Sequence, residues 1–193
     1  MVASVPISTL LSLSRYHLWA YEQLLDGLNS MKDEDYYGYA GLVFRSIHGT
    51  LNHVHAADVN WYHRLTNKDP PESYKALQSL WRANDCYSTK DSTESPWESF
   101  IKDRSELSSQ VLKQAQDYID FLSALDPDSE IPPMTFVTSG GMEFKDQDVG
   151  LTLLHIFNHG THHRGQITAG VTNLGYPPID GLDYLYYLRL LQK

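Results

Sequence analysis

The amino-acid sequence predicts an all-α protein of 193 residues, a four-helix bundle built as one domain over residues 1–193. Three observations lead to this prediction. Four long segments repeat apolar residues at spacings of three and four, the period of an amphipathic helix. Proline, glycine, Asn and Asp residues separate these segments, and no internal repeat is present. A hydrophobic share of 41% with 12% aromatic residues suffices for a packed core, which excludes a disordered chain.

The first two helices are expected within residues 7–65. Residues 7–30 carry the first apolar stripe, and Pro6 suits the start of a helix. Residues 33–41 contain two glycines and are expected to form a loop. Residues 42–65 carry the second stripe, which two consecutive prolines beyond it prevent from continuing.

A long polar crossover, residues 72–95, joins the second helix to the third. It is expected to hold one short helix at residues 73–83. Ser95 and Pro96 are the residue types that favour an N-cap and the first helical position. The third helix is therefore predicted to start there and to continue through Leu122.

The pattern changes between the third and fourth helices. Within residues 131–144, two adjacent glycines separate short runs rich in aromatic residues, which predicts a small β-hairpin. Asp146 or Asp148 can cap the fourth helix, which should end near Gly175. A short C-terminal helix is expected at residues 182–191.

Composition excludes several classes of function. The chain has 15 Lys and Arg against 24 Asp and Glu, and its net charge of -9 would repel a phosphate backbone, so no nucleic-acid partner is expected. The single cysteine, Cys86, excludes an internal disulfide and a cysteine-based zinc site. No apolar run is long enough to span a membrane, and the first 14 residues lack the basic start of a signal peptide. A cytoplasmic protein without a membrane partner is expected.

Histidine is the residue that stands out. Eight of the nine histidines fall in two short windows: His48, His53, His55 and His63, and then His155, His159, His162 and His163. His159 and His163 are four residues apart, so on a helix they project from one face and can reach one metal ion. Gly160 stands where zincin proteases carry their general-base Glu, so that protease chemistry is not encoded.

A third metal ligand is expected from the second helix. His53 shares a helical face with Gly49, Ala56, Ala57 and Asn60, and these small residues should leave room for an ion and a ligand. Three neutral imidazoles with open coordination positions are typical of a reactive metal site. The competing interpretation is a bundle whose histidines are only hydrogen-bonded core residues.

The remaining histidines are weaker candidates. His155 could extend the stripe of His159 as a further ligand or as a partner of a ligand, and His162 could orient a neighbour or lie at a dimer contact. For the other four, a hydrogen-bonded or surface role is favoured: His17, His48, His55 and His63.

Two polar residues and one arginine lie near this face in the sequence. Asn60 and Gln166 could be polar groups of a pocket or could serve helix packing. Arg164 is expected to point away from His159 and to act in a salt bridge or an interface. The sequence contains no ExxH pair for a di-iron site and none of the nucleotide-binding or serine-elbow motifs.

Several motifs resemble one known family over nearly the whole chain. The most specific is His155-Ile-Phe-Asn-His159-Gly-Thr-His-His163-Arg-Gly-Gln166, which is similar to an HxxxHRGQ signature. Others are Tyr16-His-Leu-Trp-Ala20, Ser46-Ile-His-Gly-Thr-Leu-Asn-His53-Val54, Trp97-Glu-Ser-Phe100 and Leu174-Gly-Tyr-Pro-Pro178. Together they resemble the DinB/YfiT-like metalloprotein family. The extended crossover of residues 69–95 departs from the family pattern and could alter the mouth of a pocket.

The resemblance implies a bundle of the DinB/YfiT-like type in which three histidines hold a divalent metal ion. They map onto His53, His159 and His163, the set that spacing also selects. It implies a homodimer and, since characterised relatives include thiol-dependent transferases and isomerases, a small-molecule substrate such as a low-molecular-weight thiol. Zinc or nickel is expected first, with iron or manganese as alternatives. The predicted function is a metal-dependent enzyme that activates a thiol or water for transfer, isomerisation or hydrolysis; the alternative is a non-catalytic metal-binding stress-response protein.

Overall fold

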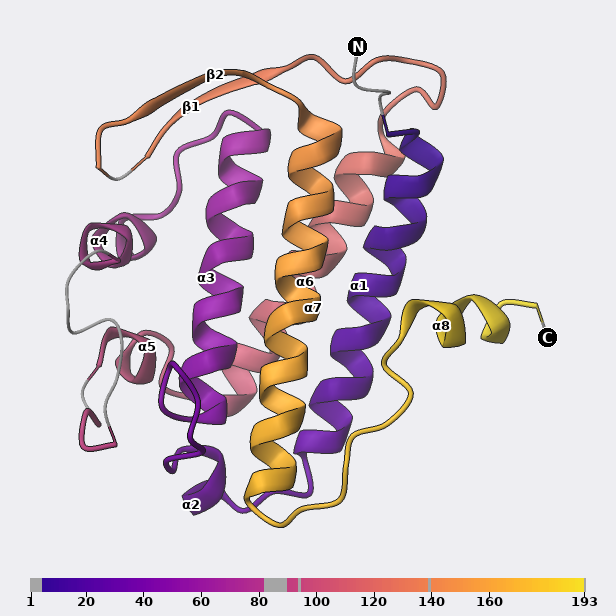
Figure 1. Ribbon diagram of the computed structural model, residues 1–193. Helices are drawn as coiled ribbons and strands as arrows, with labels where there is room; N and C mark the ends of the chain where they lie inside the picture. The colour runs from indigo at the N-terminus through magenta and orange to yellow at the C-terminus, as the bar shows by residue number, and fades with distance from the viewer. Residues whose placement is uncertain (1–4, 82–89, 94, 139, 193) are drawn as a thin grey trace.

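The computed structural model describes residues 5–81, 90–93, 95–138 and 140–192 (Figure 1). Within these ranges the protein is helical apart from one two-stranded hairpin, so the predicted all-α class is confirmed. Cys86 and the end of the short helix predicted at residues 73–83 lie outside the described residues. No helix formed by the described residues is long and apolar enough to cross a membrane.

Four long helices form the bundle: α1 (Ile7–Leu28), α3 (Ile47–Leu65), α6 (Arg104–Ser123) and α7 (Val149–Asn173). Helix α1 packs against α6 and α7, and α3 packs against the same two helices. Thus α1 and α3 occupy one diagonal of the bundle, and α6 and α7 occupy the other. In Figure 1, α7 stands between α3 and α1, with α6 behind them.

The interior of the bundle holds two apolar clusters. One contains Leu24, Leu51, Leu107 and Ile167, a residue from each long helix. The other lies toward the opposite end and includes Leu10, Tyr118, Leu122, Leu153 and Phe157. Between these clusters the helices bury polar side chains instead, among them His17, Asp58 and Arg164. A polar layer therefore divides the core at mid-height.

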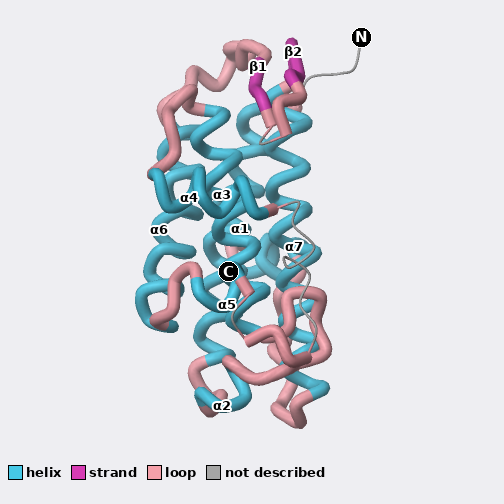
Figure 2. Tube along the Cα trace, turned by 90° about the vertical axis from the view of Figure 1, so that its left-hand side faces the viewer, coloured by secondary structure: helices cyan, strands magenta, loops and turns pink. Residues whose placement is uncertain are grey.

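Shorter elements surround the bundle. These are the helices α2 (Asp33–Tyr36), α4 (Glu72–Leu80), α5 (Pro96–Ser99) and α8 (Tyr184–Leu190), and the antiparallel strands β1 (Met134–Val137) and β2 (Glu143–Gln147). Both views place α4 and α5 on the outer side of α3 (Figures 1 and 2). The hairpin lies across the end of the bundle where α3 finishes and α7 begins.

Several predicted boundaries agree with the structure. Helix α1 covers all but the frayed end of residues 7–30, and α8 lies within residues 182–191. The hairpin is present, although its second strand continues to Gln147. Of the two candidate caps for α7, Asp148 is the one used, since its carboxylate accepts the Leu151 N–H at 2.8 Å.

The predicted start of the second long helix, at residue 42, is wrong by five residues. Arg45 has a φ of 69°, a left-handed conformation that a helix cannot contain. Ser46 then acts as the N-cap, and its hydroxyl accepts the Gly49 N–H at 2.8 Å. The preceding segment, expected to be a loop over residues 33–41, also contains the short helix α2.

The predicted third helix is wrong in its continuity. Ser95 and Pro96 do begin a helix, but it is the four-residue α5. Helix α6 starts separately after Asp103, whose carboxylate accepts the Glu106 N–H at 2.7 Å. The break lets α5 lie beside the start of α3 while α6 follows the bundle axis.

Candidate metal centre

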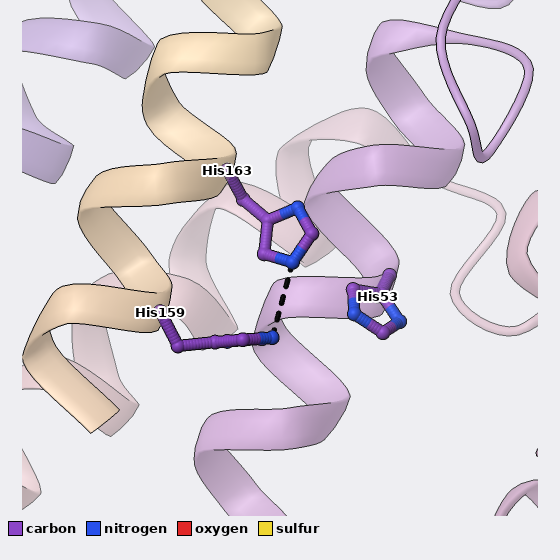
Figure 3. A group of neighbouring side chains, drawn as sticks. All are labelled: His53, His159 and His163. Atoms are coloured by element: carbon purple, nitrogen blue, oxygen red, sulfur yellow. Dashed lines mark hydrogen bonds between the residues drawn. The ribbon is translucent and has the colours of Figure 1, made fainter. Parts of the chain in front are cut away.

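His53, His159 and His163 come together between α3 and α7 (Figure 3). Each offers one ring nitrogen, and these three nitrogens all lie within 4.8 Å of one another. Two nitrogens bound to one ion at about 2.1 Å can be at most about 4.2 Å apart, so small rotations of the rings would bring all three onto one ion. The geometry is that of a candidate site for a single metal ion.

The two histidines of α7 are the closest pair. The Nε2 atoms of His159 and His163 are 3.0 Å apart, and the ring of His53 approaches them from α3, with centroids 5.5 Å from His159 and 4.7 Å from His163. Their spacing of four residues produces this pairing, because it places both side chains on the same face of one helix.

Gln166 bonds the ring nitrogen of His163 that faces away from His159. Its Oε1 atom lies 2.8 Å from His163 Nδ1, and its Nε2 atom lies 3.0 Å from His162 Nε2. An amide oxygen only accepts, so the proton of His163 sits on Nδ1 and the lone pair on Nε2 faces the cluster. Gln166 was expected to be either a polar group beside the site or a helix-packing residue, and the structure supports the first. His162 in turn bonds the Gln166 amide.

Aromatic side chains enclose His53. The Phe44 ring stacks on its imidazole with centroids 3.9 Å apart and an angle of 17° between the planes. Trp97 meets the same imidazole edge-on at 4.7 Å, and Trp81 does so at 5.8 Å. These residues were not expected from the sequence as parts of the site, because each lies outside the helical stripes that the histidines define.

A buried carboxylate positions this aromatic wall. Glu98 of α5 accepts the Ser46 hydroxyl at 2.6 Å and lies 3.5 Å from the Arg45 guanidinium. It thereby joins α5, with Trp97, to the start of α3. Gly49 permits the approach, since a Cβ there would lie 2.8 Å from the Glu98 carboxylate and 2.3 Å from the Phe44 carbonyl oxygen. The expectation that Gly49 leaves room for a ligand is therefore wrong: this space is already filled.

The environment keeps the three imidazoles neutral. Burial, followed by repulsion from His163 and His159, lowers the pKa of His53 to about 2. Burial and the neighbouring His159 lower the pKa of His163 to about 4, and burial also lowers the pKa of His159. A metal ion requires neutral imidazole ligands, so the donors are already in the form that binds a cation.

The cluster also leaves polar atoms unsatisfied. The Nδ1 atoms of His53 and His159 are buried, and neither has a hydrogen-bond partner among the described residues. Buried polar atoms are normally paired, and an unpaired one costs about 1–3 kcal/mol. The donor set and its neutrality fit a bound divalent ion, whereas the unpaired Nδ1 of His159 is not the nitrogen that faces His163 and so does not itself indicate an ion.

The other candidate residues lie outside the cluster. His155 is exposed, and its ring centroid is 6.0 Å from that of His159. His55 bonds Tyr74 at 2.8 Å, and His48 accepts from the Asn52 amide at 3.1 Å, so both are hydrogen-bonded core residues as favoured. Asn60 accepts a hydrogen bond from Gln78 of α4 and serves packing.

His17 is a hydrogen-bonded core residue as favoured, but the burial of Arg164 beside it was not predicted. Arg164 points away from His159 as expected, but it lies inside the bundle, where it bonds His17 Nδ1 at 3.3 Å and Thr161 at 2.9 Å. The other ring nitrogen of His17 bonds Asp58 at 3.2 Å. The signal in the sequence was Gly160, because a Cβ there would lie only 2.5 Å from the His17 ring.

Comparisons with known proteins agree with this architecture. A family model described as the DinB family matches residues 7–192. The chain is also 29% identical over 176 residues to Protein DinB of Bacillus subtilis (strain 168), an alignment that covers 91% of each protein. No solved structure matches the chain at a significant level.

Proposed function

The chain belongs to the DinB family, and from this membership and the histidine cluster we propose that the protein is a metal-dependent enzyme acting on a small molecule. In this proposal His53, His159 and His163 are the ligands of one divalent ion. The observation that carries it is the convergence of three neutral ring nitrogens within 4.8 Å of one another.

The ion would supply one kind of chemistry: it would lower the pKa of a thiol or of water and so provide a nucleophile at neutral pH. The reaction would be a transfer, an isomerisation or a hydrolysis. The residues of this chain have supporting roles. Gln166 fixes the tautomer of His163. Phe44 and Trp97 shield His53 from water, which strengthens electrostatic interactions at the cluster.

The ion and the thiol are further parts of the proposal. Imidazole ligands suit zinc and nickel, which come first, and iron or manganese remain alternatives. The proposed thiol belongs to a small-molecule substrate, since the three proposed ligands are all histidines and the sequence has only one cysteine, Cys86. We also propose a cytoplasmic homodimer.

A non-catalytic metal-binding protein is the second candidate. One observation favours it: among the described residues, no carboxylate joins the three histidines, so no general base of that type stands beside the proposed ion. Such a protein would bind the metal and turn over no substrate.

Metal content tests the site itself. Protein purified without a histidine tag should contain about one equivalent of metal, and a His53→Ala/His159→Ala variant should contain almost none. His155→Ala is the matched control, since it removes an exposed histidine one turn away from His159, and it should keep its metal. Equal metal content in the wild type and the double variant would overturn the proposal.

Turnover then separates the two candidates. Metal-loaded and metal-stripped protein would be incubated with electrophiles in the presence of bacillithiol, mycothiol, glutathione or water alone. A product that forms only with the loaded protein supports the enzyme. Metal binding with no metal-dependent product in any of these mixtures would favour the binding role.

A further inference from the structure

A cavity lies beside the hairpin. It is open on one side, has a volume of roughly 490 Å³ and is lined by the hairpin, the C-terminal part of α3 and the first turns of α7. The lining that matters here consists of Trp61, Arg64, Phe136, Phe144, Leu151 and His155. We call it the hairpin pocket. Its size falls in the range of about 300–1,000 Å³ that is usual for small-molecule sites.

The walls of the hairpin pocket are aromatic and flat. Phe136 and Phe144 stack with centroids 5.3 Å apart and an angle of 16° between the ring planes. Trp61 meets Phe136 edge-on, also at 5.3 Å. Phe144 and Leu151 keep 36% and 42% of their surface exposed, so the apolar wall is open to a ligand.

Arg64 brings a positive charge into this apolar wall. Its guanidinium carbon lies 4.7 Å from the centroid of the Trp61 ring and 4.6 Å from that of Phe136. Burial lowers the pKa of the guanidinium, but an arginine stays charged in proteins. Among the described residues, no carboxylate and no hydrogen-bond acceptor pairs with it.

The position of Arg64 in the last turn of α3 does not explain this arrangement. A basic side chain there commonly bonds the free carbonyl groups of the helix end. Arg64 makes no such bond to any described residue and lies between aromatic rings instead. Within the part of the chain that the structure describes, this half-buried cation has no anionic partner.

The acidic group in the lining is already engaged. Asp148 accepts the Leu151 N–H at 2.8 Å and the helix α7 starts from it, so its charge is offset by the helix terminus. His155 also lines the pocket, edge-on to Trp61 with ring centroids 5.7 Å apart, and no hydrogen bond joins its ring to any residue that the structure describes. The local charge therefore favours an anion, although the whole chain carries a net charge of -9.

We propose that the hairpin pocket binds a small molecule with a flat, apolar body and a carboxylate or similar anionic group. Arg64 binds the anionic group, and Trp61, Phe136 and Phe144 cover the body. A guanidinium pairs with a carboxylate through two parallel hydrogen bonds, which gives direction as well as affinity.

The place of the pocket links it to the histidine cluster. His155 forms part of its wall and lies one helical turn from His159, with ring centroids 6.0 Å apart. A ligand anchored at Arg64 and long enough to pass His155 would come close to His159. In this proposal the pocket recognises the substrate of the metal centre. That assignment rests on the proposed function, whereas the binding of an anion in the pocket does not.

Paired probes test the binding step on metal-stripped protein. 2-Naphthoate carries the flat body and the charge, and 2-naphthamide carries the body alone. Calorimetry should show naphthoate binding at least about tenfold more tightly than naphthamide, the size expected for one charge-assisted contact. Arg64→Gln should abolish this preference, and Arg64→Lys should retain part of it. Arg15→Gln, the same change on the exposed face of α1, should leave it intact.

Three results would overturn the proposal: no naphthoate binding by the wild type, equal affinity for the two probes, or an unchanged preference in Arg64→Gln. Circular dichroism checks that each variant is folded. If Arg64→Gln does not fold, the comparison of the two probes is made with Arg64→Lys. The link to the metal centre is tested separately with Co²⁺-loaded protein, in which the paramagnetic ion should broaden the naphthoate proton resonances. Binding without broadening would overturn the link between the pocket and the metal centre, but not the proposal that the pocket binds the anion.

Discussion

The imidazole of His17 on α1 bonds the carboxylate of Asp58 on α3 at 3.2 Å, across the diagonal of the bundle. The side chain of His17 is fully buried, and that of Asp58 is only 6% exposed. Burial outweighs the nearby carboxylate and lowers the pKa of His17, so the ring is neutral, donates from Nε2 to Asp58 and accepts on Nδ1 from Arg164. A carboxylate and a guanidinium are thus joined through one imidazole.

The other helices complete this connection. Tyr21 of α1 donates to the same Asp58 oxygen at 3.4 Å, and the Tyr118 hydroxyl of α6 donates to the Asp58 backbone carbonyl at 2.7 Å. Arg164 stacks on the Tyr21 ring. All four long helices therefore contribute to a single buried network.

Removing the carboxylate should destabilise the fold strongly. Asp58→Ala leaves His17 and Tyr21 without an acceptor and Arg164 without a counter-charge, a change that costs about 3–5 kcal/mol in other buried pairs. Urea denaturation measures it. Asp128→Ala, in an exposed loop, is the control and should change stability by less than about 0.5 kcal/mol. Equal midpoints for both variants would contradict a structural role of Asp58.

Two glycines of α7 should respond in opposite directions to the same change. Gly160→Ala places a Cβ 2.5 Å from the His17 ring, which Asp58 holds in place, and should destabilise by about 1–3 kcal/mol. Gly165→Ala meets nothing within 4 Å and should stabilise by about 0.5–1 kcal/mol through helix propensity. Thermal unfolding of both variants checks this, and a stabilised Gly160→Ala would show that the contact is not tight.

Loss of the Gln166 amide should weaken metal binding without removing a ligand. In Gln166→Leu the His163 ring loses the acceptor that fixes its tautomer, and such partners are typically worth about 10–100-fold in metal affinity. Competition with a chromophoric chelator measures the affinity. Gln116→Leu, which changes an exposed glutamine of α6, should bind as the wild type does. If both variants bound equally well, Gln166 would have no part in the site.

The metal-free protein should lose stability on mild acidification. Burial lowers the pKa of both His48 and His55 to about 4, whereas each is near 6.5 in the unfolded chain. Above about pH 6.5 both states are neutral and stability is at its maximum. From pH 6.5 down to about pH 4 the unfolded state takes up protons first, so each histidine lowers stability by up to about 1.4 kcal/mol per pH unit.

Urea denaturation at pH 7.5 and pH 5 measures this dependence. His48→Gln should show a smaller loss between the two pH values than the wild type, because one of the contributing groups is gone. Stability that does not fall between pH 7.5 and pH 5 would contradict buried neutral histidines.

The sequence predicted those features that depend on periodicity. Helix α1, helix α7 and the pairing of His159 with His163 all follow from residues spaced three or four apart on one face. His53 was selected because it could share such a face on the neighbouring helix. The four-helix class and the candidate ligand set were predictable for this reason.

Features that depend on a single backbone conformation were missed. The left-handed Arg45 delays the start of α3, and Asp103 restarts the chain as α6, yet neither residue interrupts the apolar pattern. Gly49 was interpreted as open space because its neighbours in three dimensions, Phe44 and Glu98, lie on segments that periodicity does not place. The role of Asp58 was missed for the same reason, since His17 is 41 residues away.

The polar layer between the two apolar clusters has a consequence for helix alignment. A slide of α7 by one turn, about 5.4 Å, would leave its apolar residues on the same face of the helix. It would, however, carry Arg164 among the leucines of one cluster and separate it from His17. The observed register keeps Arg164 bonded to His17, and the same register brings His159 and His163 level with His53. The buried polar layer thus fixes the position of α7 along the bundle axis, and with it the level at which His159 and His163 meet His53.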